Sequence, residues 1–406
     1  MLTTPEKTID ALGFDKNRLL RIDDWMQRNI DIGRFTGSSV LIARNGEIAH
    51  LSMAGQRSVA KDLPYERDTI VRIYSMTKMI TTVGFMMLTE RGLLHLDAPV
   101  SDFIPEFSEC RALVDGAMTA EQTETAQCPT LHHLLTHTSG LTYAFNPGTL
   151  GEAYLEKRIG FGPRSGGLVE ACKRAAAMPL AFQPGTSWEY SIGIDVIGRV
   201  IEIISGMPLD RYLSENIFQP LGMVDTAFSV PDGKVSRYAD CYTKMPGDPL
   251  FCTDPAEQSE FLETEVGTFS GGGGLLSTLD DYFQFGEMVR RGGALNGEWL
   301  LSPRTMAFMR RNHLPGEISS LGPSSFAEMP MDGMGFGLGG AVVLDPARAR
   351  TAGSVGDFGW GGMASTFFWT DPVEQITGVF FTQLIPSSSY PNRSELKALV
   401  HAALID

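Results

Sequence analysis

Cysteine is scarce in this sequence, and its few cysteines show no metal-binding or redox spacing. There are five in 406 residues, and none belongs to a Cys-x-x-Cys pair. An odd number without such spacing is typical of free thiols in a reducing compartment, and no local pattern marks one of them as a nucleophile. We therefore expect a cytoplasmic protein with reduced cysteines at Cys110, Cys128, Cys172, Cys241 and Cys252.

Long apolar runs and an excess of positive charge are also absent. Residues 1–7 show no basic start that leads into an apolar stretch, and no later segment is long enough to span a bilayer. The formal net charge of −15 disfavours nucleic acid and anionic membrane surfaces as partners. The sequence also lacks Gly-x-Ser-x-Gly, which excludes the nucleophile elbow of α/β-hydrolases.

Strands are predicted near both ends of the chain. Near the N-terminus, Asn45-Gly46 joins two short apolar runs, which is a strong hairpin pattern. Near the C-terminus, β-branched and aromatic residues predict strands over 340–344, 365–370 and 377–382. The segment between them is mostly helical in pattern. We therefore predict the α+β class, with an antiparallel sheet built from both chain termini, flanked by helices, and a large helical region inserted.

The expected division places a sheet domain in residues 1–92 and 331–406, and a mostly helical inserted domain in residues 93–330. The active site should lie between them. Without repeats or a flexible linker, a second independently folding domain is not expected. The glycine run 271–274 lacks the Gly-Lys-Ser/Thr of a phosphate loop, so we interpret it as a close approach of the backbone in or near the core rather than a ligand cradle. Helices are predicted over 15–30, 130–135, 194–205, 278–291 and 392–404.

Ser75 is the first candidate for a catalytic residue. Residues 68–73 predict a strand and residues 79–91 a helix, so Ser75 lies at a helix N-terminus, where free N–H groups favour developing negative charge. Lys78 is three residues further on and projects from the same face. A lysine can accept the serine proton when burial or another cation keeps it partly neutral. The same pattern also fits a capping Ser75 and a solvated Lys78.

Two further stretches supply candidate partners for Ser75. Tyr190 precedes a predicted helix and could act as base toward Ser75 and as acid toward a leaving group, or could be a core tyrosine. Gly361 and Gly362 precede a predicted strand, where they would let the backbone approach a ligand or would bend an edge strand. The N–H groups of Ser75 and Met363 could then form an oxyanion hole.

His133 and His137 are four residues apart and could share a helix face as metal ligands. Leu134 stands where His-Glu-x-x-His would need its glutamate, so we expect no metal site and no cofactor. His137 is instead expected to form a hydrogen bond within the loop that contains it.

The three stretches and their order resemble the serine β-lactamase and penicillin-binding-protein superfamily, and within it the family VIII carboxylesterases, which are similar to class C β-lactamases. The resemblance extends from about Leu19 to Leu404, nearly the whole chain. The matching segments are the nucleophile motif Ser75-Met76-Thr77-Lys78, the loop Leu134 to Leu141, the second motif Tyr190-Ser191-Ile192, and Trp360-Gly361-Gly362 in place of Lys-Thr-Gly.

Two departures from the class C pattern bear on the substrate. Ile192 replaces the asparagine that would contact a β-lactam side chain, and Trp360 replaces the lysine that would meet the drug's carboxylate. Both changes suit a neutral ester. The resemblance therefore implies a serine carboxylesterase that hydrolyses short-chain acyl esters through an acyl-enzyme intermediate, with Ser75, Lys78 and Tyr190 as its catalytic residues.

The resemblance leaves other functions open. These are β-lactamase or D-alanyl-D-alanine carboxypeptidase activity, acyl transfer like that of the fungal statin-side-chain transferase, and non-catalytic binding by the same fold. A small-molecule ester is the expected partner, and the oligomeric state is left open. The residues expected to bind substrate are Tyr143, Trp360, Gly361 and Gly362, with Phe145 and Phe336 as further candidates for the acyl pocket.

Overall fold

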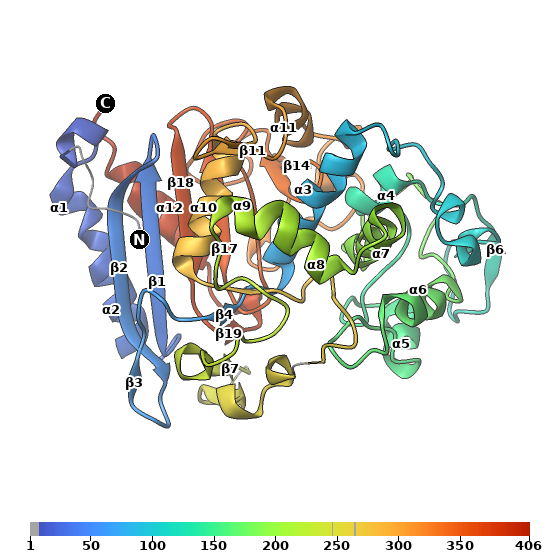
Figure 1. Ribbon diagram of the computed structural model, residues 1–406, viewed down its shortest axis with the longest axis horizontal. Helices are drawn as coiled ribbons and strands as arrows, with labels where there is room; N and C mark the ends of the chain where they lie inside the picture. The colour runs from blue at the N-terminus through green and yellow to red at the C-terminus, as the bar shows by residue number, and fades with distance from the viewer. Residues whose placement is uncertain (1–7, 246, 264) are drawn as a thin grey trace.

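The computed structural model describes residues 8–245, 247–263 and 265–406, and one large antiparallel sheet dominates it (Figure 1). The sheet has eight strands in the order β14-β15-β16-β17-β18-β1-β2-β3. N-terminal strands thus continue a sheet begun by C-terminal ones, which confirms the predicted fold class. The strands are β1 (Gly37–Arg44), β2 (Glu47–Ser58), β3 (Leu63–Pro64), β14 (Met334–Phe336), β15 (Ala341–Val343), β16 (Phe358–Gly361), β17 (Phe367–Asp371) and β18 (Ile376–Phe381).

The two ends of the chain meet where β1 pairs with β18, in a register that runs from Ser39 opposite Phe381 to Arg44 opposite Ile376. On its other side β1 pairs with β2 through the predicted hairpin. Asn45 and Gly46 have positive φ values of 56° and 88°, as a tight hairpin turn requires.

Helices cover both faces of this sheet. The terminal helices α1 (Lys16–Leu19), α2 (Arg21–Asp31) and α12 (Asn392–Ala402) share an apolar cluster with one face. Helix α10 (Leu279–Arg290) contacts β17 and β18 from the other face. The side chain of Thr278 accepts a hydrogen bond from the N–H of Asp281 and caps α10. The Asp281 carboxylate accepts hydrogen bonds from the N–H of Asp225 and the hydroxyl of Thr226.

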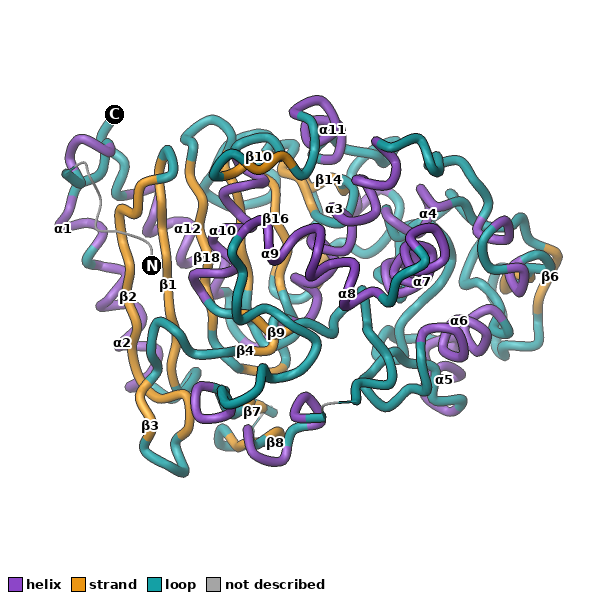
Figure 2. The backbone as a smooth tube through the Cα atoms, viewed as in Figure 1, coloured by secondary structure: helices purple, strands orange, loops and turns teal. Residues whose placement is uncertain are grey.

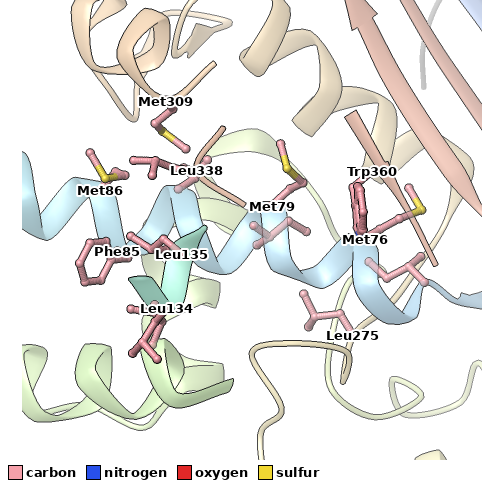
Figure 3. Packing of buried hydrophobic residues seen from close by; sticks show 14 of the residues in the cluster. Met76, Met79, Phe85, Met86, Leu134, Leu135, Leu275, Met309, Leu338 and Trp360 are labelled. Atoms are coloured by element: carbon pink, nitrogen blue, oxygen red, sulfur yellow. The ribbon is translucent and has the colours of Figure 1, made fainter. Parts of the chain in front are cut away.

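Helix α3 (Thr77–Glu90) lies between the sheet and the remaining helices, and its residues from Thr77 to Leu88 are all buried. Met79, Phe85 and Met86 pack in one cluster with Leu134 of α4 and with Leu338 (Figure 3). Burial on all sides explains why α3 has no charged face turned to solvent, and its few buried polar residues include Lys78. The neighbouring helices are α4 (Leu131–Leu135), α5 (Thr149–Glu156), α6 (Leu168–Ala176), α7 (Gly193–Ser205), α8 (Leu209–Leu213), α9 (Gln219–Leu221) and α11 (Pro303–Met309).

Outside the large sheet and these helices, the described chain forms small sheets of two or three short strands, and long loops (Figure 2). The strand predicted over 68–73 is reduced to β4 (Val71–Arg72), which pairs with β9 (Leu276–Ser277) outside the large sheet. No helix in the described residues is long and apolar enough to cross a membrane. The other strands are β5 (Arg111–Leu113), β6 (Thr123–Thr125), β7 (Cys241–Thr243), β8 (Phe251–Asp254), β10 (Ala294–Leu295), β11 (Glu298–Trp299), β12 (Ser325–Phe326), β13 (Met329–Pro330) and β19 (Leu384–Ile385).

Candidate active site

Ser75 lies in a single 3-10 turn, Tyr74–Met76, that connects β4 to α3. Tyr74, the residue before it, has a positive φ of 42°, which is uncommon for a non-glycine residue and marks a sharp change in chain direction. The N–H of Met76 donates to the carbonyl of Ile73 and closes the turn. Ser75 is therefore held at the start of a buried helix, as the sequence predicts.

Lys78, in the first turn of α3, is fully buried, and its amine has three hydrogen-bond acceptors. The Nζ atom is 2.6 Å from the carbonyl oxygen of Gly272, 2.9 Å from the hydroxyl of Tyr143 and 3.3 Å from Oγ of Ser75. An ammonium group has three N–H donors, so each donor has one acceptor. The structure thus brings Lys78 to Ser75 and excludes a solvated Lys78.

Asp195, in the first turn of α7, lies behind this lysine and is also buried. Its Oδ1 atom accepts from Ser270 Oγ at 2.5 Å and from the Gly272 N–H at 3.0 Å, and its Oδ2 lies 3.5 Å from the Tyr143 hydroxyl. Burial raises the pKa of the Asp195 carboxyl, although the Lys78 charge opposes the shift. A carboxylate among the apolar residues of the first turn of this helix is the sequence feature that could have identified this residue.

The glycine run predicted to approach other backbone does so beside Lys78 and Asp195. A Cβ atom on Gly272 would clash with the Asp195 carboxylate, and one on Gly271 would lie 2.8 Å from the carbonyl of Ile194 in α7. The close approach lets the peptide at Gly272 donate to Asp195 and accept from Lys78. The prediction is confirmed, and the glycine also supplies backbone contacts in the site.

Tyr143 joins the two charged residues in one hydrogen-bonded series. Its hydroxyl accepts from Lys78 Nζ and donates toward Asp195 Oδ2. Burial, together with the Asp195 charge, raises the pKa of this phenol well above its usual value, so it stays protonated. The ring stacks on Phe145 with centroids 4.7 Å apart, and Phe145 is 61% exposed.

Tyr190 lies just before α7 and is almost fully buried. Its ring centroid is 4.6 Å from Lys78 Nζ, but its hydroxyl accepts a 3.1 Å hydrogen bond from Nε1 of Trp360. Within the described part of the chain, this hydroxyl forms no hydrogen bond with Ser75 or Lys78. The structure therefore places the Tyr190 ring against the lysine and directs its oxygen to Trp360 on β16.

His137 packs against Tyr190 with ring centroids 4.7 Å apart and is fully buried. Its Nδ1 accepts from the Ser191 N–H at 3.2 Å, so His137 supports the segment that carries Tyr190 rather than its own loop, where the sequence placed its hydrogen bond. Burial, with the nearby Lys78 charge, lowers the pKa of His137 well below its usual value. His133 instead accepts from the Thr130 N–H at the start of α4.

Gly361 and Gly362 bring the end of β16 to the Ser75 turn. A Cβ atom on Gly362 would clash with the carbonyl of Ile73, and Gly362 donates a 2.7 Å hydrogen bond to Thr366. In the described residues, neither the Ser75 N–H nor the Met363 N–H donates a hydrogen bond. Both groups remain free to donate to a ligand, as an oxyanion hole requires.

The aromatic residues around Tyr190 differ in exposure. Phe336 is fully buried against His137, Trp188 and Trp360, so it belongs to the core rather than to a pocket wall. Phe326, which the sequence did not point to, is partly exposed and contacts Tyr190 with centroids 4.8 Å apart. No local pattern marks Phe326, because it reaches the site from a distant hairpin.

These geometries agree with what comparisons with known proteins show. The model of the Beta-lactamase family matches residues 22–402, and the chain belongs to this family. It is 33% identical over 366 residues to Esterase EstB of Burkholderia gladioli, and the alignment covers 86% of each chain. It is 29% identical over 391 residues to Monacolin J acid methylbutanoyltransferase of Aspergillus terreus, and the alignment covers 90% of each chain.

A solved structure supports the same assignment. The structure titled EstCE1, a hydrolase with promiscuous acyltransferase activity, superposes with a TM-score of 0.79 and 29% identity. The match covers 96% of this chain and 99% of that one. The resemblance to the family VIII esterases of the serine β-lactamase superfamily is thereby confirmed.

Proposed function

We propose that this protein hydrolyses short-chain acyl esters through an acyl-enzyme intermediate on Ser75. The chain is a serine hydrolase of the β-lactamase fold, and the similar protein EstB is named an esterase. The observation that carries the proposal is the 3.3 Å contact between Ser75 Oγ and the buried amine of Lys78.

Lys78 is positioned to accept the proton of Ser75. As a neutral amine, it would keep two N–H donors for Gly272 and Tyr143 and present its lone pair to the Ser75 hydroxyl. As Oγ forms a bond to the ester carbonyl carbon, its proton moves to Nζ, and the resulting ammonium donates to all three acceptors. The same partners therefore accommodate both charge states.

The other groups would act on the two oxygens of the substrate. The carbonyl oxygen becomes an oxyanion, which the free N–H groups of Ser75 and Met363 would stabilise. The Tyr190 oxygen accepts from Trp360, so its own hydrogen is available for the departing alkoxide. A water molecule would then add to the acyl carbon as one of its protons passes to the tyrosinate. The bond between the acyl carbon and Oγ would break to release the acid, and Oγ would recover a proton from the Lys78 ammonium that it contacts.

Acyl transfer to an alcohol is the second candidate function. One relative is named a methylbutanoyltransferase, and EstCE1 is described as having promiscuous acyltransferase activity. An alcohol in place of water would complete the same two steps. β-Lactam hydrolysis is disfavoured, because Trp360 fills the position of the usual cation and packs against Tyr190.

The test is a p-nitrophenyl ester series, from acetate to decanoate, with wild type and Ser75→Ala. We expect the highest rates with short chains and loss of activity in the variant, whereas the exposed Ser388→Ala control stays active. A serine-directed phosphonate should label wild type and not Ser75→Ala. Activity that survives in Ser75→Ala would refute the proposal, and an inactive, unlabelled wild type would support a non-catalytic binding protein.

The remaining expectations are part of the same proposal. We assign a small-molecule ester as the partner and the cytoplasm as the location, which five free cysteines support. We also retain the division into residues 1–92 with 331–406 and residues 93–330, with the active site between them. In support, Lys78 comes from the first part and its acceptors Tyr143 and Gly272 come from the second.

A further inference from the structure

The hairpin formed by β12 and β13 lies over the aromatic residues of the site. Its turn contains Ala327 with a positive φ of 51°, and Phe326 precedes that turn. The Phe326 ring is stacked on Trp360, with centroids 5.7 Å apart and planes 17° apart, and it contacts Tyr190 at 4.8 Å. Phe326 is partly exposed, whereas Tyr190 and Trp360 are only 4% exposed. Phe326 is thus the outer layer over both.

Two sets of contacts hold this hairpin in place. Near its base, the N–H of Trp188 donates to the carbonyl of Leu321 at 2.8 Å, next to the chain segment of Tyr190. At its turn, Glu328 forms a 3.0 Å ion pair with Arg393 of α12, and these side chains are 6% and 9% exposed. A buried ion pair contributes little net stability, but removal of one partner leaves a buried charge unpaired. The pair therefore restricts where the hairpin can lie.

We propose that Phe326 limits the size of the alcohol portion of the ester that the enzyme accepts and that the Glu328–Arg393 pair holds its ring in position. The inference rests on the proposed esterase function. The Tyr190 ring lies against Lys78, its hydroxyl is assigned to the departing alkoxide, and Trp360 packs against it. An alcohol portion that extends over these two rings meets the Phe326 ring. Each methylene group buried in an apolar pocket is worth roughly a factor of four in binding, so a blocked pocket should discriminate steeply by chain length.

The first experiment changes the size of this side chain in both directions. We would measure kcat/KM for methyl, butyl and octyl acetate with wild type, Phe326→Ala and Phe326→Trp. The control is Phe308→Ala, an exposed phenylalanine of α11 (41% exposed). The ratio of kcat/KM for octyl acetate to that for methyl acetate should rise at least tenfold in Phe326→Ala, fall in Phe326→Trp and stay unchanged in the control.

A second series varies the acyl chain of p-nitrophenyl esters at constant alcohol. If Phe326 bounds the alcohol side, the variants should change the ranking of alcohols and leave the ranking of acyl chains as in wild type. An unchanged ratio of octyl acetate to methyl acetate, an equal fall for every ester, or a change confined to the acyl series would overturn the proposal. Should Phe326→Ala fail to fold, Phe326→Trp tests the same wall in the opposite direction.

The role of the ion pair is tested by Glu328→Gln alone and combined with Phe326→Ala. Alone, it should shift the ratio in the same direction as Phe326→Ala. In the double variant it should add nothing, because the ring that it positions is gone. Additive effects would refute the holding role. Failure of this inference would leave wild type active and Ser75 labelled, whereas failure of the proposed function would leave wild type inactive with every ester.

Discussion

Nε1 of Trp360 donates a hydrogen bond of 3.1 Å to the hydroxyl oxygen of Tyr190. This bond connects β16 of the sheet to the segment just before α7, and both side chains are buried. In the class C pattern a lysine stands where this sequence has Trp360. The indole supplies a neutral hydrogen-bond donor to the tyrosine at that position.

Trp360→Phe should lower kcat/KM for p-nitrophenyl acetate by about fivefold, because it removes a donor worth about 1 kcal/mol while it retains an aromatic ring. The thermal midpoint should change by only a few degrees. The matched control is Trp299→Phe, since Trp299 is 68% exposed. Full activity in Trp360→Phe would show that the indole N–H does not assist Tyr190.

Lys78→Ala should lose activity by about a thousandfold or more and still fold, since the amine is the only group in hydrogen-bond contact with Ser75 Oγ among the described residues. Circular dichroism would establish that the fold is kept, and ester turnover would measure the loss. The surface residue Lys173, 47% exposed in its side chain, gives the control Lys173→Ala. A fully active Lys78→Ala would remove this lysine from the mechanism.

The two tyrosines beside Lys78 should differ in effect. Tyr190→Phe removes the hydroxyl that we assign as the acid toward the alkoxide, and we expect a loss of at least about a hundredfold. Tyr143→Phe removes one acceptor of Lys78 and one donor to Asp195, and a loss of about tenfold is expected. Single-turnover kinetics on both variants would test the order. A larger loss in Tyr143→Phe than in Tyr190→Phe would indicate that Tyr143, and not Tyr190, is the acid toward the alkoxide.

Gly272→Ala should destabilise the protein by about 1–3 kcal/mol, because the added methyl group would clash with the buried Asp195 carboxylate. Activity should fall as well, since the Gly272 carbonyl accepts from Lys78. Gly160→Ala is the control, because a Cβ atom there meets nothing within 4 Å. Equal urea midpoints for the two variants would contradict the close approach.

Stability should also depend on pH through Asp281. Burial raises the pKa of this carboxyl from 3.8 to about 6 in the folded protein. Folding therefore favours the protonated carboxyl. Its contribution to the free energy of unfolding is full below about pH 4 and is lost as the pH rises through about 6. Relative to Asp281→Asn, the unfolding free energy of wild type should fall by roughly 3 kcal/mol across this range. Urea titrations of both proteins at pH 4, 5, 6 and 7 would measure this fall. A difference in unfolding free energy that stays constant with pH would contradict the raised pKa of Asp281.

Local sequence was sufficient to predict that Ser75 and Lys78 lie together, and much of the secondary structure. Ser75 and Lys78 share one helical turn, so their spacing alone places them on one face. The Asn45-Gly46 hairpin likewise depends on the φ values that two adjacent residues can adopt. The pattern over 68–73 predicts a strand longer than the observed Val71–Arg72. The observed strand is short because its partner, about two hundred residues further along the chain, extends only over Leu276–Ser277.

The sequence by itself therefore determined the fold class, the family and the placement of Ser75 beside Lys78, since these depend on motif order and on interactions between near neighbours. Only the tertiary structure decided which groups surround Lys78, where the Tyr190 hydroxyl is directed and that Phe326 covers both Tyr190 and Trp360. Those contacts join residues far apart in the chain. They depend on how helices and sheet pack together, which no local pattern of side chains encodes.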